Sequence, residues 1–392
     1  MCEGLAQKLT PIPRADGYRQ TQAGEWYSNP INFQRPDMAR PARTGKMPSA
    51  RRTSVTRPLV SIILPTYNRA RFLPEALSAI AAQTLTDWEL IVVDDGSTDD
   101  TPEVIRAHAA TVGRPLRYVP QANGGAYAAR NTGLAHASGE CVAFYDSDDL
   151  WLPRYLERLA GALARHPEVA WAYAACRSVD QSSGRELASS TFYEAGRPRP
   201  FLALRATRDE EGFRVIDDPG LVACQIEYGL YAGLQNSLIR RSVFEHERFC
   251  PDYRVVEDVL FLIRRLAEGM RIGYYDEVQV TYRVHDDNSS ASVSGAGSSK
   301  LLPVYEEQVL GLESLQRSTT LTPGDARALR RRLAHVAFWH LGYAGYWQRG
   351  DGPAASRAFR RALRVWPWSP SMWKTWLATE VRRATGFAPT SG

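Results

Sequence analysis

Residues 88–95, "WELIVVDD", join an apolar run to two carboxylates at its end. A strand that is apolar on both faces is typical of a parallel sheet covered by helices on both sides. Similar strands are predicted at 59–67 ("LVSIILPTY"), 140–146 ("ECVAFYD") and 169–176 ("VAWAYAAC"). Amphipathic helical patterns lie between them, so the sequence predicts an α/β fold with a mainly parallel sheet flanked by helices.

The chain divides into three regions by composition. Residues 1–57 are rich in Arg, Pro, Ser and Thr without an apolar period, which predicts a disordered N-terminal extension. Residues 58–300 hold the predicted sheet domain, and 301–392 predict a helical C-terminal extension. In that extension, 331–351 and 353–367 predict an antiparallel helix pair resembling a tetratricopeptide unit, expected to pack on the sheet domain or on a partner.

Bulk composition excludes several classes of protein. With 392 residues, of which 44% are hydrophobic and 23% charged, the chain is expected to be globular. A net charge of +5 is too small over this length to indicate nucleic acid. Five scattered cysteines without a Cys-x-x-Cys pair fit a reducing cytoplasm better than a disulfide framework or a zinc site. No apolar run approaches 18 residues, so a cytoplasmic protein that does not span a membrane is predicted.

The C-terminal region is basic and rich in tryptophan. From residue 325 onward, twelve Lys and Arg accompany three Asp and Glu, and residues 366–383 read "WPWSPSMWKTWLATEVRR". Aromatic residues beside cations are typical of a helix that anchors a peripheral protein at a membrane interface. They equally suit a face that packs against the sheet domain. Both interpretations stay open at the level of sequence.

Polar motifs follow the predicted strands. They are "PTYNR" at 65–69, "DDGSTDD" at 94–100 and "DSDD" at 146–149. In open parallel sheets, ligands bind beyond the carboxyl ends of the strands, so we expect these motifs to meet at one site. Carboxylates, hydroxyls and an aromatic ring suit a nucleoside and a cation. The absence of Gly-x-Gly-x-x-Gly after the first strand argues against NAD, and the absence of a Walker A motif argues against a P-loop ATPase.

An ordered series of motifs carries a family resemblance. It comprises "SIILPTYNR", "LIVVDDGSTDDT", "NGGAYAARNTGLAHASGE", "AFYDSDD", "VVEDVLFLIR" and "YRVH". With these motifs in this order, residues 58–285 resemble a family 2 glycosyltransferase with the GT-A (nucleotide-diphospho-sugar transferase) fold. The resemblance implies donor-binding roles for six residues ahead of the metal motif: Pro65, Thr66, Tyr67, Asp94, Asp95 and Arg130.

The resemblance also implies the residues of the chemical step. Asp146 and Asp148 match the Asp-x-Asp motif, whose last acid ligates a divalent cation, Mn²⁺ or Mg²⁺, on the diphosphate. The resemblance implies that both residues are metal ligands and that Asp146 also contacts the donor. Glu257 and Asp258 match a later acidic pair, whose Asp serves as catalytic base. His285 matches a histidine that in several relatives touches the metal or the diphosphate.

Structural interpretations stand beside these assignments. Asp146 or Ser147 is a candidate cap for a helix expected to begin near Leu150, and residues 94–98 are candidate caps for the next helix. Glu257 and Asp258 would satisfy the macrodipole of the helix that they begin. His285 would equally serve as a surface residue at a strand end.

Together these features predict an inverting glycosyltransferase that is metal-dependent. The expected donor is a nucleotide-diphosphate sugar, in first place a UDP-sugar, and the expected acceptor is a glycan or a lipid-linked molecule in polysaccharide biosynthesis. One alternative is a sugar-1-phosphate nucleotidyltransferase, which needs a Gly-rich basic loop where this chain has "PTYNRARF". The other is a non-catalytic nucleotide-sugar-binding protein, against which the presence of Asp148 and Asp258 argues.

Overall fold

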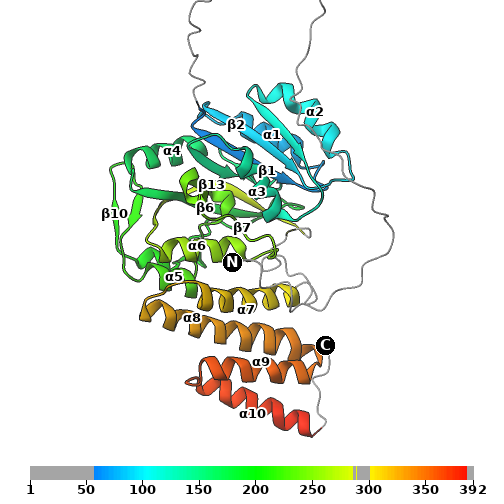
Figure 1. The fold of residues 1–392 in the computed structure, drawn as a ribbon, viewed down its shortest axis with the longest axis vertical. Helices are drawn as coiled ribbons and strands as arrows, with labels where there is room; N and C mark the ends of the chain where they lie inside the picture. Colours follow the sequence, from blue (N-terminus) through cyan, green and yellow to red (C-terminus); the bar gives the residue numbers. More distant parts are fainter. Residues whose placement is uncertain (1–56, 286–287, 289–300, 386–392) are drawn as a thin grey trace, which may run out of the picture. The chain divides into compact units, whose positions relative to one another are not determined.

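The computed structural model describes residues 57–285, 288 and 301–385 (Figure 1). The described residues from Arg57 onward belong to one compact unit. The extension predicted to be disordered, residues 1–57, lies outside the described part except for Arg57. The proposed boundary between a sheet domain and a helical extension at residue 300 therefore stays a prediction.

One large sheet forms the centre of this unit. Its strands follow the order β10-β11-β13-β6-β12-β4-β1-β2-β3. The pairs β1–β2, β1–β4, β2–β3 and β6–β13 are parallel, whereas β12 is antiparallel to both of its neighbours. The bounds are β1 Val60–Thr66, β2 Trp88–Asp94, β3 Leu116–Pro120, β4 Cys141–Phe144, β6 Val169–Asp180, β10 Ala206–Arg208, β11 Arg214–Ile216, β12 Ser237–Arg240 and β13 Arg271–Val284.

Short strands complete the sheet at its margins. β5 (Leu150–Trp151) pairs with β13, and β7 (Glu186–Ala188) pairs with β6. A separate hairpin joins β8 (Tyr193–Glu194) to β9 (Arg197–Pro198). The predicted mainly parallel sheet is thus confirmed, with antiparallel strands where β12 and the margins enter.

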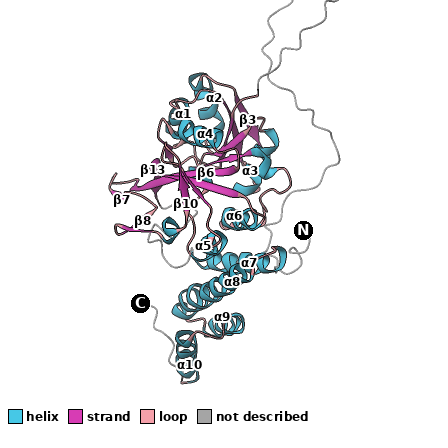
Figure 2. Cartoon of the chain, turned by 90° about the vertical axis from the view of Figure 1, so that its left-hand side faces the viewer, coloured by secondary structure: helices cyan, strands magenta, loops and turns pink. Residues whose placement is uncertain are grey.

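Helices cover both faces of the sheet (Figure 2). Alternate side chains of β1 enter different cores: Ile62 packs with α1 and α4, and Ile63 packs with α3 and α6. This alternation is the reason why the strand is apolar throughout. The helices are α1 Leu73–Ala81, α2 Thr101–Val112, α3 Ala126–His136, α4 Tyr155–Arg165, α5 Leu221–Glu227 and α6 Glu257–Ala267, with 3₁₀ turns at Pro200–Ala203, Leu234–Asn236 and Arg241–Phe244.

Helix α3 lies against β1 because it carries a glycine at the contact. A Cβ atom on Gly133 would lie 2.3 Å from Cγ2 of Ile63. At Gly139, which follows the helix, a Cβ would lie 2.6 Å from the backbone nitrogen of Ser61. These close approaches fix α3, and the polar side chains at its N-terminal end, relative to the end of β1.

Two expected helix caps are not observed. The helix predicted near Leu150 begins at Tyr155, because Leu150 and Trp151 pair with Thr281 and Val280 of β13. Neither Asp146 nor Ser147 caps it, since its N-cap is Arg154 and makes no side-chain hydrogen bond. The cap expected for α2 from residues 94–98 is likewise absent: its N-cap is Asp100, and Asp99 accepts a hydrogen bond from the Thr101 N–H.

The first two C-terminal helices pack on the sheet domain, as one of the two alternatives predicted for the helical extension, and the last of them packs on the helix before it. The C-terminal helices are α7 Leu301–Ser318, α8 Pro323–His335, the π-helical η4 Val336–Tyr346, the turn η5 Trp347–Arg349, α9 Gly352–Val365 and α10 Pro370–Ala384, drawn from yellow to red in Figure 1. One buried cluster joins Val256 and Leu260 to Val309 and Leu312 of α7. The end of the sheet domain and the helical extension therefore share a core.

Candidate active site

The polar motifs meet where parallel strands end. Thr66 at the end of β1 lies beside Asp94 at the end of β2, and Ile63 lies beside Phe144 of β4. Hydrogen bonds extend these pairings past the strands: the Asp95 N–H donates to the Thr66 carbonyl at 2.8 Å. The predicted convergence of residues 65–69, 94–100 and 146–149 is therefore present at this edge of the sheet.

Hydrogen bonds join the loop after β1 to the loop after β2. Asn68 adopts a left-handed backbone with φ of 52°. Its N–H donates to Ser97 Oγ at 3.0 Å, and its Oδ1 accepts from the Thr98 N–H at 2.8 Å. Pro65 lies inside β1 opposite Val93. The side chain of Tyr67 is 48% exposed, so its ring is accessible to a ligand at this edge.

Asp94 and Asp95 are buried and hydrogen-bonded within the protein. Asp94 accepts from the Ser97 N–H at 2.8 Å and from Tyr118 Oη at 2.5 Å. Burial, followed by this hydrogen bond, raises the pKa of Tyr118, which keeps its hydroxyl protonated as a donor. The role of Asp94 in donor binding stays a prediction.

Asp95 fastens the glycine turn that begins α3. Its Oδ1 accepts from Gln121 Nε2 at 2.7 Å and from the Gly124 N–H at 2.8 Å, while Oδ2 accepts from the Gly125 N–H at 2.8 Å. Gly125 has a φ of 89°, a backbone region that favours glycine. Asp95 therefore sets the start of α3, and a further contact to a donor base stays a prediction.

Arg130 on α3 forms an ion pair with Asp146. Its Nη2 lies 2.8 Å from Asp146 Oδ1, and its guanidinium lies 5.3 Å from the centroid of the Tyr127 ring. Burial alone would lower the pKa of Arg130, but Asp146, Tyr127 and Asp258 together outweigh it and raise that pKa. The charge of Asp146 is thus compensated inside the protein. Its predicted role as a metal ligand stays a prediction.

Asp148 and His285 come together from distant parts of the chain. His285 Nε2 lies 3.2 Å from Asp148 Oδ2, and the imidazole stacks on the Phe72 ring at 5.2 Å. Arg69 from the "PTYNR" motif lies 3.9 Å from the same carboxylate oxygen. The main chain of this turn is held by Arg283, whose Nε donates to the Asp148 carbonyl. The structure therefore joins two of the predicted metal-site residues.

The ligand atoms of Asp148 and His285 suit a divalent cation that also binds the substrate. In the described part of the chain, no group of three or more His, Cys, Asp or Glu side chains is arranged to hold a metal ion by itself. Mg²⁺ and similar hard cations are commonly held by one or two carboxylates together with substrate phosphates and water. Asp148 and His285 supply one oxygen and one nitrogen, which suits such a shared site.

Asp149, the third acid of "DSDD", is buried and connects two segments of the main chain. It is 1% exposed, and its Oδ1 accepts from the Arg283 N–H at 3.2 Å. Burial first, and then the charges of Asp148 and Asp146, raise its pKa well above the ordinary value. It joins β13 to the turn after β4 and is directed away from solvent.

Asp258 lies in the first turn of α6 beside Tyr127. Tyr127 Oη is 3.1 Å from Asp258 Oδ1, which also accepts from the Val259 N–H at 2.9 Å. Burial raises the pKa of Asp258, although the nearby Arg130 guanidinium opposes the shift. Asp258 is therefore a carboxylate of increased basicity that is linked through Arg130 to the acids after β4.

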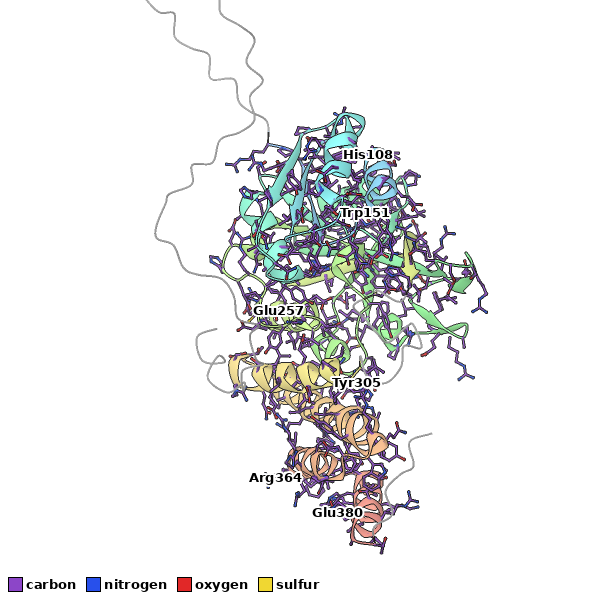
Figure 3. The ribbon with its side chains drawn as sticks, turned by 90° about the vertical axis from the view of Figure 1, so that its right-hand side faces the viewer. His108, Trp151, Glu257, Tyr305, Arg364 and Glu380 are labelled. Carbon is purple, nitrogen blue, oxygen red and sulfur yellow. The ribbon has the colours of Figure 1, made fainter. Side chains whose placement is uncertain are left out.

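Glu257, predicted as the partner of Asp258 in catalysis, is instead fully buried (Figure 3 labels it on α6). Its Oε1 accepts from the Cys250 N–H at 2.9 Å and from Arg264 Nη2 at 2.6 Å. A carboxylate with no exposed surface and an internal ion pair is not positioned to meet a substrate. These contacts hold Glu257 inside the protein, and its predicted catalytic role stays a prediction.

Sequence reasoning missed Tyr127 as a site residue. Its motif was recognised, but an aromatic residue at the start of a helix is usually part of a core. The available signal is its spacing of three from Arg130, which places both side chains on one face of α3. That face meets Asp258 and Asp146 only in the folded protein.

Comparison with known proteins finds similarity to glycosyltransferases. Residues 61–216 match the family described as Glycosyl transferase family 2. The chain is 31% identical over 228 residues to the uncharacterized glycosyltransferase EpsJ of Bacillus subtilis, covering 58% of this chain and 61% of EpsJ. It is 40% identical over 99 residues to the Escherichia coli UDP-Glc:alpha-D-GlcNAc-diphosphoundecaprenol beta-1,3-glucosyltransferase WfgD, covering 25% of this chain and 38% of WfgD.

A solved structure has the same fold. The crystal structure of S. aureus TarS 1-349 in complex with UDP-GlcNAc aligns with a TM-score of 0.54 and 21% identity, covering 78% of this chain and 81% of that one. The chain therefore has a GT-A fold, and residues 61–216 are similar to the family 2 glycosyltransferases. It spans less than two thirds of the length of the two curated relatives described here.

Proposed function

We propose that this protein is an inverting glycosyltransferase that uses a nucleotide-diphosphate sugar, with a UDP-sugar as the first choice. The observation that carries the proposal is the placement of Asp258 beside the acids that follow β4, linked to them through Tyr127 and Arg130. The name of WfgD, a UDP-glucose-dependent enzyme acting on a diphosphoundecaprenol-linked sugar, supports a glycan or lipid-linked acceptor.

Asp148 and His285 are the residues proposed to hold the divalent cation. When bound there, Mn²⁺ or Mg²⁺ supplies positive charge that stabilises the diphosphate as it leaves the sugar. Arg69 lies close to Asp148 and is available to the same phosphates. Asp146 is proposed to assist indirectly, because its ion pair holds Arg130 at the edge of the site.

Asp258 is the residue proposed to take the proton of the acceptor hydroxyl. An aliphatic hydroxyl must lose this proton as its oxygen attacks the anomeric carbon, and a positioned carboxylate contributes general base catalysis. The raised pKa of Asp258 favours the transfer, because a more basic carboxylate is a better proton acceptor. Attack from the side opposite the diphosphate inverts the anomeric centre.

The nucleoside is proposed to lie between the loops after β1 and β2. Tyr67 offers an exposed ring for stacking on the base, and Pro65 and Thr66 hold that loop at the sheet edge. Asp94 and Asp95 line the neighbouring strand end. Stacking of a base on an aromatic ring adds affinity without requiring a particular base. We therefore assign the proposed preference for uracil to hydrogen bonds from the base to Asp94 or Asp95.

Release of nucleoside diphosphate tests this function. The full chain is incubated with a panel of UDP-, GDP- and TDP-sugars, Mn²⁺ and an extract of bacterial lipid-linked glycans. We expect one donor to release nucleoside diphosphate, with the sugar transferred to the extract. A nucleotidyltransferase would instead release pyrophosphate from a nucleoside triphosphate and a sugar phosphate. No release of nucleoside diphosphate from any donor would contradict the proposal.

We also propose cytoplasmic location with peripheral contact to an anionic membrane through α10. In the described residues, no helix is long and apolar enough to cross a membrane. Trp373, Leu377 and Val381 recur every four residues on one face of α10, and they are 39%, 54% and 63% exposed. Residues 352–384 carry seven Lys and Arg against the single acid Glu380. Such a surface matches the charge of anionic lipid.

Vesicle sedimentation tests the membrane contact. The protein is expected to bind phosphatidylcholine vesicles that contain phosphatidylglycerol, and to bind pure phosphatidylcholine weakly because the cationic attraction is lost. Trp373→Ser combined with Leu377→Ser should abolish binding. Leu310→Ser, which removes a similarly exposed side chain on α7, should leave it unchanged. Equal binding by all three proteins would contradict the proposal.

A further inference from the structure

The segment that leads into α6 is held by a residue of the C-terminal helices. Glu307 on α7 accepts three hydrogen bonds at one oxygen, Oε1, from the N–H groups of Arg254 at 2.9 Å, Val255 at 2.7 Å and Val256 at 2.9 Å. The N-cap residue of α6 is Val256, whose apolar side chain makes no capping hydrogen bond. The group that holds this segment therefore comes from about fifty residues further along the chain.

This arrangement matches the electrostatics of a helix end. The Val256 N–H lies at the N-cap, where the aligned peptide dipoles of α6 place partial positive charge, and the N–H groups of Arg254 and Val255 precede it. A carboxylate that accepts several N–H groups forms charge-assisted hydrogen bonds, which are stronger than neutral ones. Glu307 thus fixes the backbone of residues 254–256 immediately before Glu257 and Asp258.

Packing between α6 and α7 sets the position of Glu307. A Cβ atom on Gly311, one turn further along α7, would lie 2.6 Å from Cδ1 of Leu260. Val309 and Leu312 are buried in the same cluster as Leu260. Because the two helices approach so closely, α7 has little freedom to slide, and Glu307 stays opposite the start of α6.

Tyr127 holds the same segment from the other side. Its Oη lies 3.0 Å from the Val255 carbonyl and 3.1 Å from Asp258 Oδ1, and it accepts from the Asp258 N–H at 3.3 Å. Val255 is therefore fixed at its N–H by Glu307 and at its carbonyl by Tyr127. Asp258 follows three residues later, so its position depends on both contacts.

We propose that Glu307 is a positioning residue for the catalytic base Asp258, which makes the C-terminal helices part of the catalytic apparatus. The inference rests on the proposed function of Asp258. Glu307 touches no substrate: it acts by holding the segment that orients the base. Loss of this orientation lowers the rate of the chemical step, while the donor site at the ends of β1, β2 and β4 keeps its geometry.

Glu307→Ala is the test variant. We expect kcat for nucleoside diphosphate release to fall about a hundredfold, the effect typical of a displacement of about 1 Å at a reacting group. The KM for the donor should stay within twofold of wild type, because no donor-binding residue is changed. Glu307→Gln should recover much of the rate, since its amide oxygen still accepts the three N–H groups.

Glu306→Ala is the matched control. Glu306 is the neighbouring acid on α7, and it accepts from Tyr346 Oη at 2.5 Å rather than from the start of α6. The kcat of Glu306→Ala should equal that of wild type. Equal rates for Glu307→Ala and Glu306→Ala, or a parallel loss of donor affinity and kcat in Glu307→Ala, would overturn the proposal.

Hydrogen exchange separates this inference from the proposed function. Amide exchange at residues 254–258 needs no activity, and Glu307→Ala should accelerate it at least tenfold while Glu306→Ala leaves it unchanged. Unchanged exchange in Glu307→Ala would overturn the positioning role even in an active enzyme. Absence of nucleoside diphosphate release from the wild-type chain would overturn the function instead.

Discussion

Asp258→Asn is expected to abolish sugar transfer while leaving donor binding intact. Asn keeps the size of the side chain and an oxygen that accepts from the Val259 N–H, so α6 should begin in the same way. It has no carboxylate to take the acceptor proton, and loss of a general base costs about a hundredfold to ten-thousandfold in rate. Steady-state transfer and calorimetric donor titration measure the two effects separately.

Asp252→Asn is the control for this substitution. Asp252 is an exposed acid in the loop before α6, so the variant makes the same chemical change outside the site. It should transfer sugar at the wild-type rate. Transfer by Asp258→Asn at more than a tenth of that rate would exclude Asp258 as the base.

The pH profile gives an independent check on the same residue. The base must be ionised, so activity is present above its pKa and is lost as the pH falls through it. Because burial raises the pKa of Asp258, the acid limb of kcat/KM should have its midpoint above about 4, the ordinary value for Asp. A midpoint below that value would mean that the proton acceptor is a different, more acidic group.

Asp148→Ala is expected to remove the metal-dependent part of donor binding. The substitution deletes the carboxylate that lies 3.2 Å from His285 Nε2 and leaves the imidazole without its acidic neighbour. Loss of even an indirect metal contact typically costs tenfold to a hundredfold in affinity, so we expect a loss of at least about a hundredfold. Calorimetric titration with a nucleotide-sugar, with Mn²⁺ and with a chelator, measures it.

The titrations of wild type and Asp148→Ala should agree under two conditions. Wild type with chelator and Asp148→Ala with Mn²⁺ should bind the donor with similar, weak affinity. Asp87→Ala provides the control, because Asp87 is an exposed acid immediately before β2, at the opposite end of that strand from the site. Full Mn²⁺-dependent affinity in Asp148→Ala would show that the cation binds elsewhere.

The layered fold is predictable because its signal is local. The central strands β1, β2 and β4 are mostly apolar and buried, and "WELIVVDD" alone shows the pattern of burial on both faces. The polar ends of these strands then point to the site. In contrast, the short strand at Leu150–Trp151 was predicted as helix, since its partner on β13 lies about 130 residues away in sequence.

The different roles of neighbouring acids depend on tertiary contacts, which the sequence does not show. Glu257 and Asp258 are adjacent and chemically alike, yet one is buried against Arg264 and the other faces Tyr127. Asp146 and Asp148 also have different partners: Asp146 forms an ion pair with Arg130, whereas Asp148 lies beside His285. Glu307 belongs to a region that shows no family motif. Its contact with α6 becomes visible only when α7 is packed in place.

Calorimetry on the wild-type chain tests the central claim most directly. The chain is titrated with nucleotide-sugars differing in base and sugar, first with Mn²⁺ and then with a chelator. The account predicts that a UDP-sugar binds with a Kd in the micromolar range, about −8 kcal/mol, and that the chelator weakens this binding. Absence of binding by every nucleotide-sugar in the presence of Mn²⁺ would contradict it.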